Sequence, residues 1–221
     1  MNIHSAITKG AEVLKAKLIQ NPYLDSEVIM SKVIKKPREY FLLNSKKKLN
    51  KKELSFFKTL IKKRSYGKPI AYLTNKKCFW KSEFFVTEDT LIPRPDTEII
   101  IENVLKLTKN KKKLNLLDIG VGSGCIILSI LKERKDFHGT GLDISKNTLN
   151  ICKINAKNLQ VHHRIKLFKS DVDKFKLGKY DLIVSNPPYI KSHKIKYLEK
   201  NIAEFEPKLA LDGGLDGLSE I

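Results

Sequence analysis

An apolar segment that runs into a glycine-rich turn and then into a second apolar segment constrains the fold of this chain most strongly. Residues 114–119 are typical of a buried strand, and residues 125–131 are apolar enough for a buried helix. Between them lies Gly120–Gly124, with the spacing G-x-G-x-G. Strand, glycine turn and helix in this order predict an α/β fold with a Rossmann-like parallel sheet.

The glycine turn is suited to binding a ligand. Glycines let the backbone approach a ligand closely, and the N–H groups at the start of the next helix point toward it. The spacing differs from the G-x-G-x-x-G of dinucleotide sites, and the turn lacks the lysine of a phosphate-binding P-loop. The cofactor contacts predicted in the turn are Gly120, Val121, Gly122, Ser123 and Gly124.

Two further predicted strands end in acidic residues. Residues 138–142 are followed by Asp143, in a position where an acidic side chain accepts hydrogen bonds from ribose hydroxyls. Residues 164–169 are followed by Ser170, Asp171 and Val172. Adenosine without a pyrophosphate fits this set better than NAD does, so Asp143, Asp171 and Val172 are also expected to contact a cofactor.

A fourth predicted strand, residues 181–185, ends at Asn186-Pro187-Pro188-Tyr189. Each proline lacks an N–H and fixes its own φ, so the strand must stop there. The turn therefore lies at the carboxyl end of the strand, where open α/β sheets bind ligands. A plain proline turn after a buried strand is the alternative interpretation.

This turn carries acceptors suited to the methylation of an amino group. A planar conjugated amino group is a poor nucleophile because its lone pair is delocalised, so a site that alkylates it needs acceptors for both hydrogens. The Asn186 side-chain oxygen and the Pro187 carbonyl can accept them, and Tyr189 offers a flat face for packing. With an adenosine site nearby, this predicts S-adenosylmethionine as the cofactor and direct in-line transfer without a strong base.

The predicted site falls into three sets of residues. The catalytic set is Asn186, Pro187 and Tyr189, and the substrate-binding set adds Pro188. Asn186 is also expected to contact the cofactor. No metal ligands are predicted.

The chain resembles the protein-(glutamine-N5) methyltransferase family, which modifies class I peptide chain release factors. The matching segments are Ile92–Glu98, Asp118–Gly124, Asp143–Ser145, Asn155–Ala156, Asn186–Ile190, Glu206–Pro207, Ala210–Leu211, Gly213–Gly214 and Asp216–Leu218. They extend from about Lys68 to the last residue, and the first and last segments are the most specific. Cys125 and Val172 depart from the family pattern; Val172 replaces an aromatic residue that many relatives have, which weakens adenine packing there.

The resemblance implies methyl transfer to the side-chain amide nitrogen of a release-factor glutamine, by a cytoplasmic enzyme with a class I methyltransferase sheet. Family members continue past Asp216–Leu218 with a helix and three strands. The resemblance therefore implies a truncated sheet, with residues 181–185 as an apolar edge and a weakly stable, self-associating, poorly active chain.

Three regions are expected. Residues 1–67 form a helical bundle, in which Ile3, Ile7, Ala11, Leu14 and Leu18, then Leu24, Val28 and Ile29, and then Leu54, Phe57, Leu60 and Ile61 recur at helical spacing. Asn50 and Glu53 form a capping-box-like start for the last of these helices. Residues 68–95 form a linking β-hairpin, and residues 96–221 form an incomplete methyltransferase domain. By resemblance, the helical bundle recognises the release factor.

The composition favours a soluble cytoplasmic enzyme. The chain has 43 basic and 24 acidic residues, a formal charge of +19, yet only five of the basic residues are arginines. A general lysine bias is favoured over a dedicated nucleic-acid surface, because sites that grip phosphate or guanine favour arginine. No apolar run is long enough for a membrane span. Cys78, Cys125 and Cys152 are expected to be reduced, buried thiols.

Two other functions stay open. A nucleic-acid adenine or guanine amino-methyltransferase uses the same acceptors on a flipped base, and the positive charge favours it. The helical module and the lack of an inserted recognition domain oppose it. An inactive partner-binding remnant of the enzyme is the second alternative.

Two acidic residues near the predicted site have expected roles. Asp118 is expected to brace the glycine turn by hydrogen bonds, and Glu98 lies either on a helix surface or, with Arg94, near the methyl donor.

Overall fold

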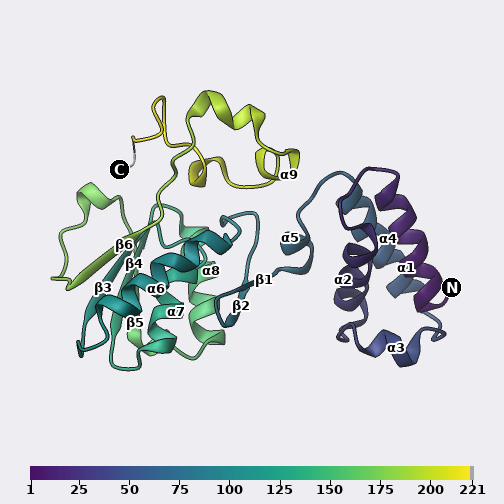
Figure 1. The fold of residues 1–221 in the computed structure, drawn as a ribbon, viewed down its shortest axis with the longest axis horizontal. Helices are drawn as coiled ribbons and strands as arrows, with labels where there is room; N and C mark the ends of the chain where they lie inside the picture. Colours follow the sequence, from purple (N-terminus) through teal and green to yellow (C-terminus); the bar gives the residue numbers. More distant parts are fainter. Residues whose placement is uncertain (220–221) are drawn as a thin grey trace. The chain divides into compact units, whose positions relative to one another are not determined.

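The computed structural model describes residues 1–219, which divide into two compact units that meet between Asn75 and Lys76 (Figure 1). The first unit is helical, and the second contains two sheets with flanking helices. The first unit includes a short helix beyond residue 67, and the sequence-based limits of 1–67, 68–95 and 96–221 stay predictions. Among residues 1–219, no helix is both long and apolar enough to cross a membrane.

The helical unit is built around one apolar core. Its helices are α1 (Ile3–Lys15), α2 (Pro22–Ile34), α3 (Tyr40–Asn44), α4 (Lys51–Ser65) and α5 (Ile70–Thr74). Side chains from all five helices meet in the core, among them Leu14, Met30, Phe41, Phe57 and Leu73. Asn50 and Glu53 form the predicted capping box at the start of α4, with both reciprocal hydrogen bonds present.

The predicted apolar stripe of the first helix is wrong at its end. Helix α1 stops at Lys15, and Leu18 lies beyond it with a φ of 57° and a side chain that is 92% exposed. Leu24 is 42% exposed, whereas Ile29 is fully buried. The apolar residues therefore keep a helical spacing in the sequence beyond the point where the helix itself ends.

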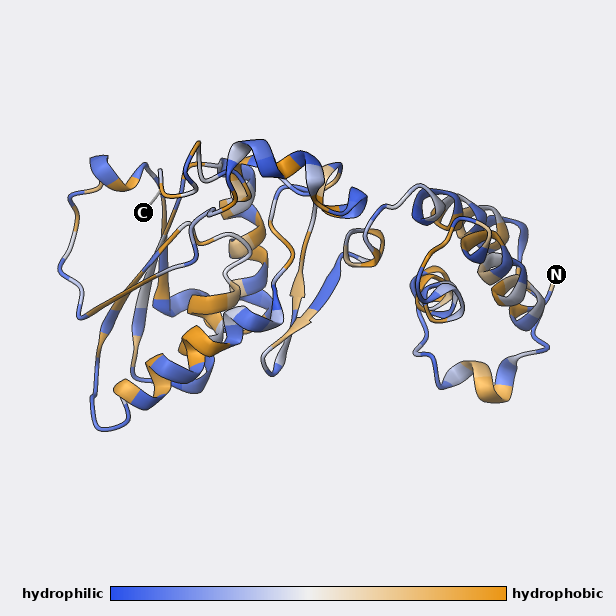
Figure 2. Cartoon of the chain, turned by 45° about the horizontal axis from the view of Figure 1, so that its top comes forward, coloured by the Kyte–Doolittle hydropathy of each residue, from blue (hydrophilic) through white to orange (hydrophobic). Residues whose placement is uncertain are grey.

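Helix α3 carries an exposed apolar surface. Leu42 and Leu43 are 82% and 92% exposed, and α3 appears in Figure 2 as an orange segment at the bottom of the helical unit. Only Phe41 of this helix is buried.

The second unit begins with the predicted hairpin. Strand β1 (Lys76–Phe79) pairs antiparallel with β2 (Ser82–Phe85). Pro95 then begins the 3₁₀ turn Pro95–Thr97, which leads into α6 (Glu98–Leu107). Proline suits this position because a backbone N–H in the first helical turn would have no partner within the helix, so its absence costs nothing.

The main sheet is fully parallel and confirms the predicted α/β class. Its strands are β3 (Asn115–Ile119), β4 (His138–Asp143), β5 (Ile165–Lys169) and β6 (Leu182–Ser185), in the spatial order β5-β4-β3-β6. Helices α7 (Cys125–Glu133) and α8 (Lys146–Asn158) connect β3 to β4 and β4 to β5. Right-handed crossovers that progress in one direction place both helices on the same face, and α6 packs beside α7 (Figure 1).

Strand β6 is an edge strand within the described residues. It pairs with β3 alone, and its Ile183 side chain is 58% exposed while Val184 is buried. The segment that follows contains the 3₁₀ turn Ser192–Tyr197, the short helix α9 (Lys200–Ala203) and the 3₁₀ turn Lys208–Ala210.

Gly10 of α1 allows the close packing of the helical unit. A Cβ atom at Gly10 would lie 2.5 Å from Ser26 Oγ, 2.9 Å from Phe57 and 3.0 Å from Ile61. Ser26 is fully buried and donates a hydrogen bond to the Ile7 carbonyl at 2.7 Å, so it has little freedom to move. The residue at position 10 must therefore lack a side chain.

We expect Gly10→Ala to destabilise the protein by about 1–3 kcal/mol through overpacking, although alanine is the better helix former by about 1 kcal/mol. Thermal and urea unfolding followed by helical circular dichroism measures the change. Lys9→Ala, at an exposed position of the same helix, serves as the control and should be near neutral. A Gly10→Ala variant as stable as the parent would contradict this account of the packing.

Candidate active site

The carboxyl ends of the four parallel strands meet at one edge of the sheet. Ile119 at the end of β3 lies opposite Leu142 of β4 and Ser185 of β6. The glycine turn follows β3 and the Asn-Pro-Pro-Tyr turn follows β6. The two strands are neighbours, so the turns start side by side.

The glycine turn has the conformation and the space that a ligand requires. Gly120 and Gly122 have φ values of 70° and 56°, in the left-handed region that favours glycine. A Cβ atom at Gly120 would meet nothing within 4 Å, and one at Gly122 would meet only the Gly120 carbonyl at 3.8 Å. The space beside these two residues is therefore open. At Gly124 a Cβ atom would lie 2.7 Å from Cys152 Sγ, so this third glycine serves packing instead.

Asp143 shapes the turn. Its Oδ2 accepts a hydrogen bond from the Gly122 N–H at 3.1 Å, and its Oδ1 accepts one from the Ser145 N–H at 2.9 Å. Burial raises the pKa of Asp143, and these two backbone N–H groups oppose the shift. Each carboxylate oxygen has further lone pairs, so the side chain can still accept hydrogen bonds from hydroxyl groups.

The expectation that Asp118 braces the turn by hydrogen bonds is wrong. The side chain is 1% exposed, and within the described residues neither carboxylate oxygen has a hydrogen bond of normal geometry. Burial raises the pKa of Asp118 to about 8; the nearby Ile127 backbone opposes the shift only in part, and the charge of Asp143 adds to it. Asp143 performs the bracing that was assigned to Asp118.

Asp171 and Val172 follow β5 at the same edge of the sheet. Asp171 Oδ1 accepts a hydrogen bond from the Asp173 N–H at 3.2 Å, which caps a short 3₁₀ turn. Both residues are exposed. Their contact with a cofactor stays a prediction.

Asn186 is oriented by a partner that the sequence did not single out. Its Nδ2 donates to Thr97 Oγ1 at 3.4 Å, and Thr97 is buried at the start of α6. Beside it, Ser185 Oγ donates to the Ile119 carbonyl at 2.9 Å, which ties the end of β6 to the end of β3. With its nitrogen turned toward Thr97, Asn186 keeps its Oδ1 as a free acceptor, since no described residue donates to it.

A pocket of about 210 Å³ opens beside the Asn-Pro-Pro-Tyr turn. Its walls are mostly apolar, with Asn186 and Arg94 as the main polar side chains. The lining residues are Leu91, Arg94, Asn186, Pro187, Tyr189, Ile190, Leu198, Ile202, Ala210 and Leu211. The structure thus brings Asn186, Pro187 and Tyr189 to one cavity, while Pro188 is not part of its lining.

An ion pair fixes one wall of this pocket. Arg94 Nη2 donates to Glu206 Oε1 at 2.7 Å, and Glu206 Oε2 accepts from the Ile92 N–H at 3.3 Å. The Glu206 side chain is 1% exposed, so its charge depends on Arg94 for compensation. The pair joins the segment before α6 to the segment after α9. Both residues belong to segments that carry the family resemblance, but their pairing was not predicted.

The chain after the turn folds back and supports it. The Ile190 N–H donates to the Leu211 carbonyl at 3.1 Å, and the Gly213 N–H donates to the Ile190 carbonyl at 2.9 Å. Ser192 Oγ donates to Asp212 Oδ1 at 2.6 Å. A Cβ atom at Gly213 would lie 2.7 Å from the Pro188 carbonyl, so a larger residue would push the turn out of place.

Asn155 links the glycine turn to the hairpin. Its Oδ1 accepts from the Phe85 N–H at 2.7 Å, and its Nδ2 donates to the carbonyls of Phe85 and Ser123, both at 2.9 Å. The residue is fully buried. Glu98 has a similar structural role, because its carboxylate accepts from the Trp80 N–H at 2.7 Å.

The cysteines differ from one another. Cys78 is exposed, which corrects the expectation that all three are buried. Burial raises the pKa of Cys125 to about 12 and also raises the pKa of the buried Cys152, so neither forms a thiolate readily. Residues 1–219 contain no group of three or more side chains suited to holding a metal ion.

Two protein-family models match the chain. The methyltransferase small domain matches residues 95–215, and the PrmC N-terminal domain matches residues 5–74. The matched regions correspond to most of the sheet-containing unit and of the helical unit.

Curated relatives match 95% or more of the chain. The release factor glutamine methyltransferase of Buchnera aphidicola subsp. Acyrthosiphon pisum is 38% identical over 100% of this chain and 78% of its own length. The enzymes of the same name from Caulobacter vibrioides and Leptospira interrogans are 33% and 38% identical, over 99% and 95% of this chain and 76% and 75% of their own. A solved SAM-dependent methyltransferase from Geobacter sulfurreducens is 20% identical, with a TM-score of 0.35 over 39% of this chain and 35% of its own, and this weak likeness adds nothing further.

The raised pKa of Asp118 predicts how stability depends on pH. In the folded state Asp118 holds its proton up to about pH 8, whereas in the unfolded state it loses the proton near its ordinary pKa of 3.8. Between these values the folded state binds more protons, so this group lowers stability as pH rises through that window. We expect ligand-free Asp118→Asn to be at least about 1 kcal/mol more stable than the parent at pH 8, with a smaller difference at pH 5.

Thermal unfolding of both proteins at a series of pH values measures this. Asp136→Asn provides a matched control, because hydrogen bonding lowers the pKa of that carboxyl. The Asp136 variant should lose stability relative to the parent. A constant difference between the parent and Asp118→Asn from pH 5 to pH 8 would show that Asp118 is ionised throughout.

Proposed function

Because this chain belongs to the release factor glutamine methyltransferase family, we propose that it transfers a methyl group from S-adenosylmethionine to the side-chain amide nitrogen of a glutamine in class I peptide chain release factors. The observation that carries the proposal is the orientation of Asn186. Its nitrogen is engaged by Thr97, and its oxygen is left as an acceptor at the wall of a small pocket. This pocket lies at the same edge of the sheet as the open glycine turn.

The residues of the glycine turn fit the cofactor. The open space at Gly120 and Gly122 allows a ligand to approach the backbone, and Val121, Ser123 and Gly124 complete the turn. Asp143, which holds the Gly122 N–H, accepts hydrogen bonds from the ribose hydroxyls in this proposal. The bound cofactor supplies a methyl group on a positively charged sulfur, which needs no further activation.

The Asn-Pro-Pro-Tyr turn acts on the acceptor. Asn186 Oδ1 and the Pro187 carbonyl accept the two hydrogens of the target amide, which turns the nitrogen lone pair toward the methyl group. These acceptors become more favourable as positive charge develops on the nitrogen, so they stabilise the transition state more than the ground state. The apolar walls of the pocket exclude water and orient the amide.

No general base is required. The surplus proton becomes acidic once the nitrogen is tetrahedral, and it can then leave to solvent. The described residues that line the pocket include no carboxylate and no histidine.

The helical unit supplies the recognition surface for the protein substrate. Leu42 and Leu43 of α3 expose an apolar surface on this unit, which is unfavourable in water and is typical of a protein-binding site. A protein partner fits such a surface better than a nucleic acid does. In this proposal the enzyme works in the cytoplasm, where release factors act.

We expect Asn186→Ala to lower kcat by at least about 10²-fold, because it removes an acceptor that acts mainly in the transition state. Cofactor affinity should stay within a few-fold. The assay uses labelled S-adenosylmethionine with purified release factor, and with duplex DNA as the alternative acceptor. Asn110→Ala, at an exposed position beyond the opposite ends of the strands, is the matched control. A variant that keeps most of its rate would rule out the amide-acceptor mechanism.

Asp143→Ala should weaken cofactor binding by at least about tenfold, through the loss of charge-assisted hydrogen bonds to the ribose and of the brace on Gly122. The KM for the release factor should change little. Calorimetric titration with S-adenosylmethionine measures the affinity directly, and an unchanged value would reject this role for Asp143.

A further inference from the structure

A basic surface lies at the amino ends of β3, β4 and β5, opposite the candidate active site, whereas β6 is preceded by the acidic Asp181. Residues 108–113 precede β3, residues 134–137 precede β4, and Arg164 immediately precedes β5. These segments contain seven basic residues and one acidic residue, Asp136. We call this surface the basic rim; its basic members are Lys109, Lys111, Lys112, Lys113, Arg134, Lys135 and Arg164.

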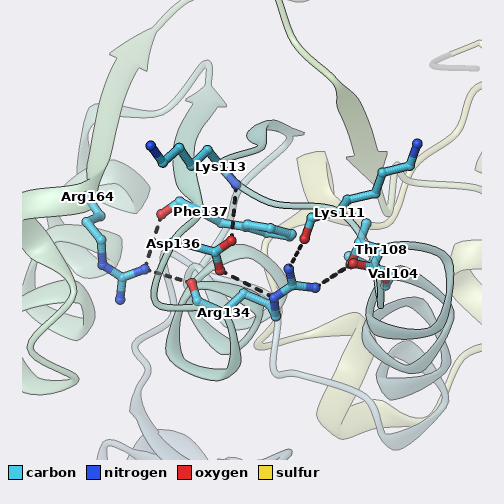
Figure 3. A network of polar contacts seen from close by, with 8 residues as sticks. All are labelled: Val104, Thr108, Lys111, Lys113, Arg134, Asp136, Phe137 and Arg164. Atoms are coloured by element: carbon cyan, nitrogen blue, oxygen red, sulfur yellow. Dashed lines mark hydrogen bonds and ion pairs between the residues drawn. The ribbon is translucent and has the colours of Figure 1, made fainter.

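Two arginines hold the rim in shape (Figure 3). Arg134 donates to the Thr108 carbonyl at 2.7 Å and to the Lys111 carbonyl, and its guanidinium lies 4.1 Å from the centre of the Phe137 ring. Arg164 donates to the carbonyls of Arg134 and Phe137 at 3.0 and 3.2 Å. These bonds are made to neutral carbonyl groups, so they fix the loops without themselves neutralising charge; the only ion pair of either arginine among residues 1–219 is that of Arg134 with Asp136.

The one carboxylate of the rim is already engaged. Asp136 Oδ2 accepts from the Lys113 N–H at 3.1 Å, and its Oδ1 accepts from Arg134 Nε at 3.4 Å. These hydrogen bonds, led by the one from Lys113, lower the pKa of Asp136. The carboxylate therefore stabilises the loop backbone and offsets only one of the seven positive charges.

The lysines of the first loop have no ionic partner among the described residues. Lys113 has a φ of 54°, in a region that residues other than glycine adopt at a cost in energy, and the surrounding network holds it there. Lys109, Lys111, Lys112 and Lys113 are all exposed, and none takes part in an ion pair found among residues 1–219. In Figure 3 the side chains of Lys111 and Lys113 extend away from the arginine network.

The rim is also hollowed. A surface cavity of about 620 Å³ is lined by Lys109, Asn110, Lys111, Lys112, Arg134 and Asp136. A concave surface with several uncompensated lysines concentrates anions and fits a flexible chain of phosphates better than it fits a flat membrane. The nearby aromatic ring of Phe137 is fully buried, so it is not available for stacking on bases.

We propose that the basic rim binds single-stranded nucleic acid through its phosphate backbone, without reading its sequence. The arginines preorganise the loops, and the lysines neutralise successive phosphates. Because the rim lies at the opposite ends of the strands from the glycine turn, a bound strand leaves the candidate active site open.

The test compares two variants with equal loss of charge. In the rim variant, Lys109, Lys111, Lys112 and Lys113 are each replaced by Gln; in the control, Lys46, Lys48, Lys51 and Lys52 of the helical unit are replaced in the same way. Binding of a labelled single-stranded RNA of mixed sequence is measured by fluorescence anisotropy over a range of salt concentrations. We expect the rim variant to bind at least about tenfold more weakly. The slope of the logarithm of the binding constant against the logarithm of salt concentration should fall in magnitude by roughly 2–3, since each lysine-phosphate contact contributes about 0.7 to it.

The control variant should keep most of its affinity and slope. Equal losses in both variants would show that the overall charge of the chain binds RNA, and unchanged binding by the rim variant would exclude the rim; either result overturns the proposal. Tighter binding to vesicles of anionic lipid, lost in the same rim variant, would also overturn it.

Two further measurements keep the result interpretable. The rim variant should methylate release factor at the parental rate and unfold at the parental temperature. If it does not fold, the double variant Lys109→Gln, Lys112→Gln takes its place, with about half the expected change in salt slope. An unchanged slope in the double variant would equally overturn the proposal.

Discussion

The parallel pairing of β3 with both β4 and β6 is the constraint on which the candidate site depends. It brings the ends of three strands into register, so that the glycine turn, Asp143 and the Asn-Pro-Pro-Tyr turn share one edge. Hydrogen bonds at that edge then hold the turns relative to one another. Ser185 bonds to the end of β3, and Asp143 bonds to the glycine turn. A change in strand register would separate the expected cofactor site from the pocket.

A second group of contacts supports the site from outside the sheet. Asn155 joins the glycine turn to the hairpin, and the Arg94–Glu206 pair joins the two segments that flank the pocket. Both Asn155 and Glu206 are buried polar groups whose partners are all in place. Asp118 differs, because it is buried beside the glycine turn without a hydrogen bond. Burial raises the pKa of this carboxyl group, so its charged form is unfavourable in the folded protein.

Local patterns predicted much of this structure. Glycine spacing, paired prolines and the Asn50–Glu53 capping box act over a few residues, and the elements that they predicted are present. Helical spacing was less reliable at the end of α1, where Leu18 continues the pattern but not the helix. Contacts between distant segments were not predictable. Arg94 and Glu206 are 112 residues apart, and Asn186 and Thr97 are 89 apart, so only the folded chain shows that they meet. The sequence also did not show that Asp143, and not Asp118, accepts a hydrogen bond from the glycine turn.

The most direct test of the central claim is to locate the transferred methyl group. Purified protein, isotopically labelled S-adenosylmethionine and a class I release factor are incubated together, and the products are mapped by tandem mass spectrometry, with duplex DNA and single-stranded RNA in parallel reactions. We expect one methyl group on the side-chain nitrogen of a release-factor glutamine and none on nucleic acid. A methyl group found on a nucleobase, or on another atom of the release factor, would contradict it.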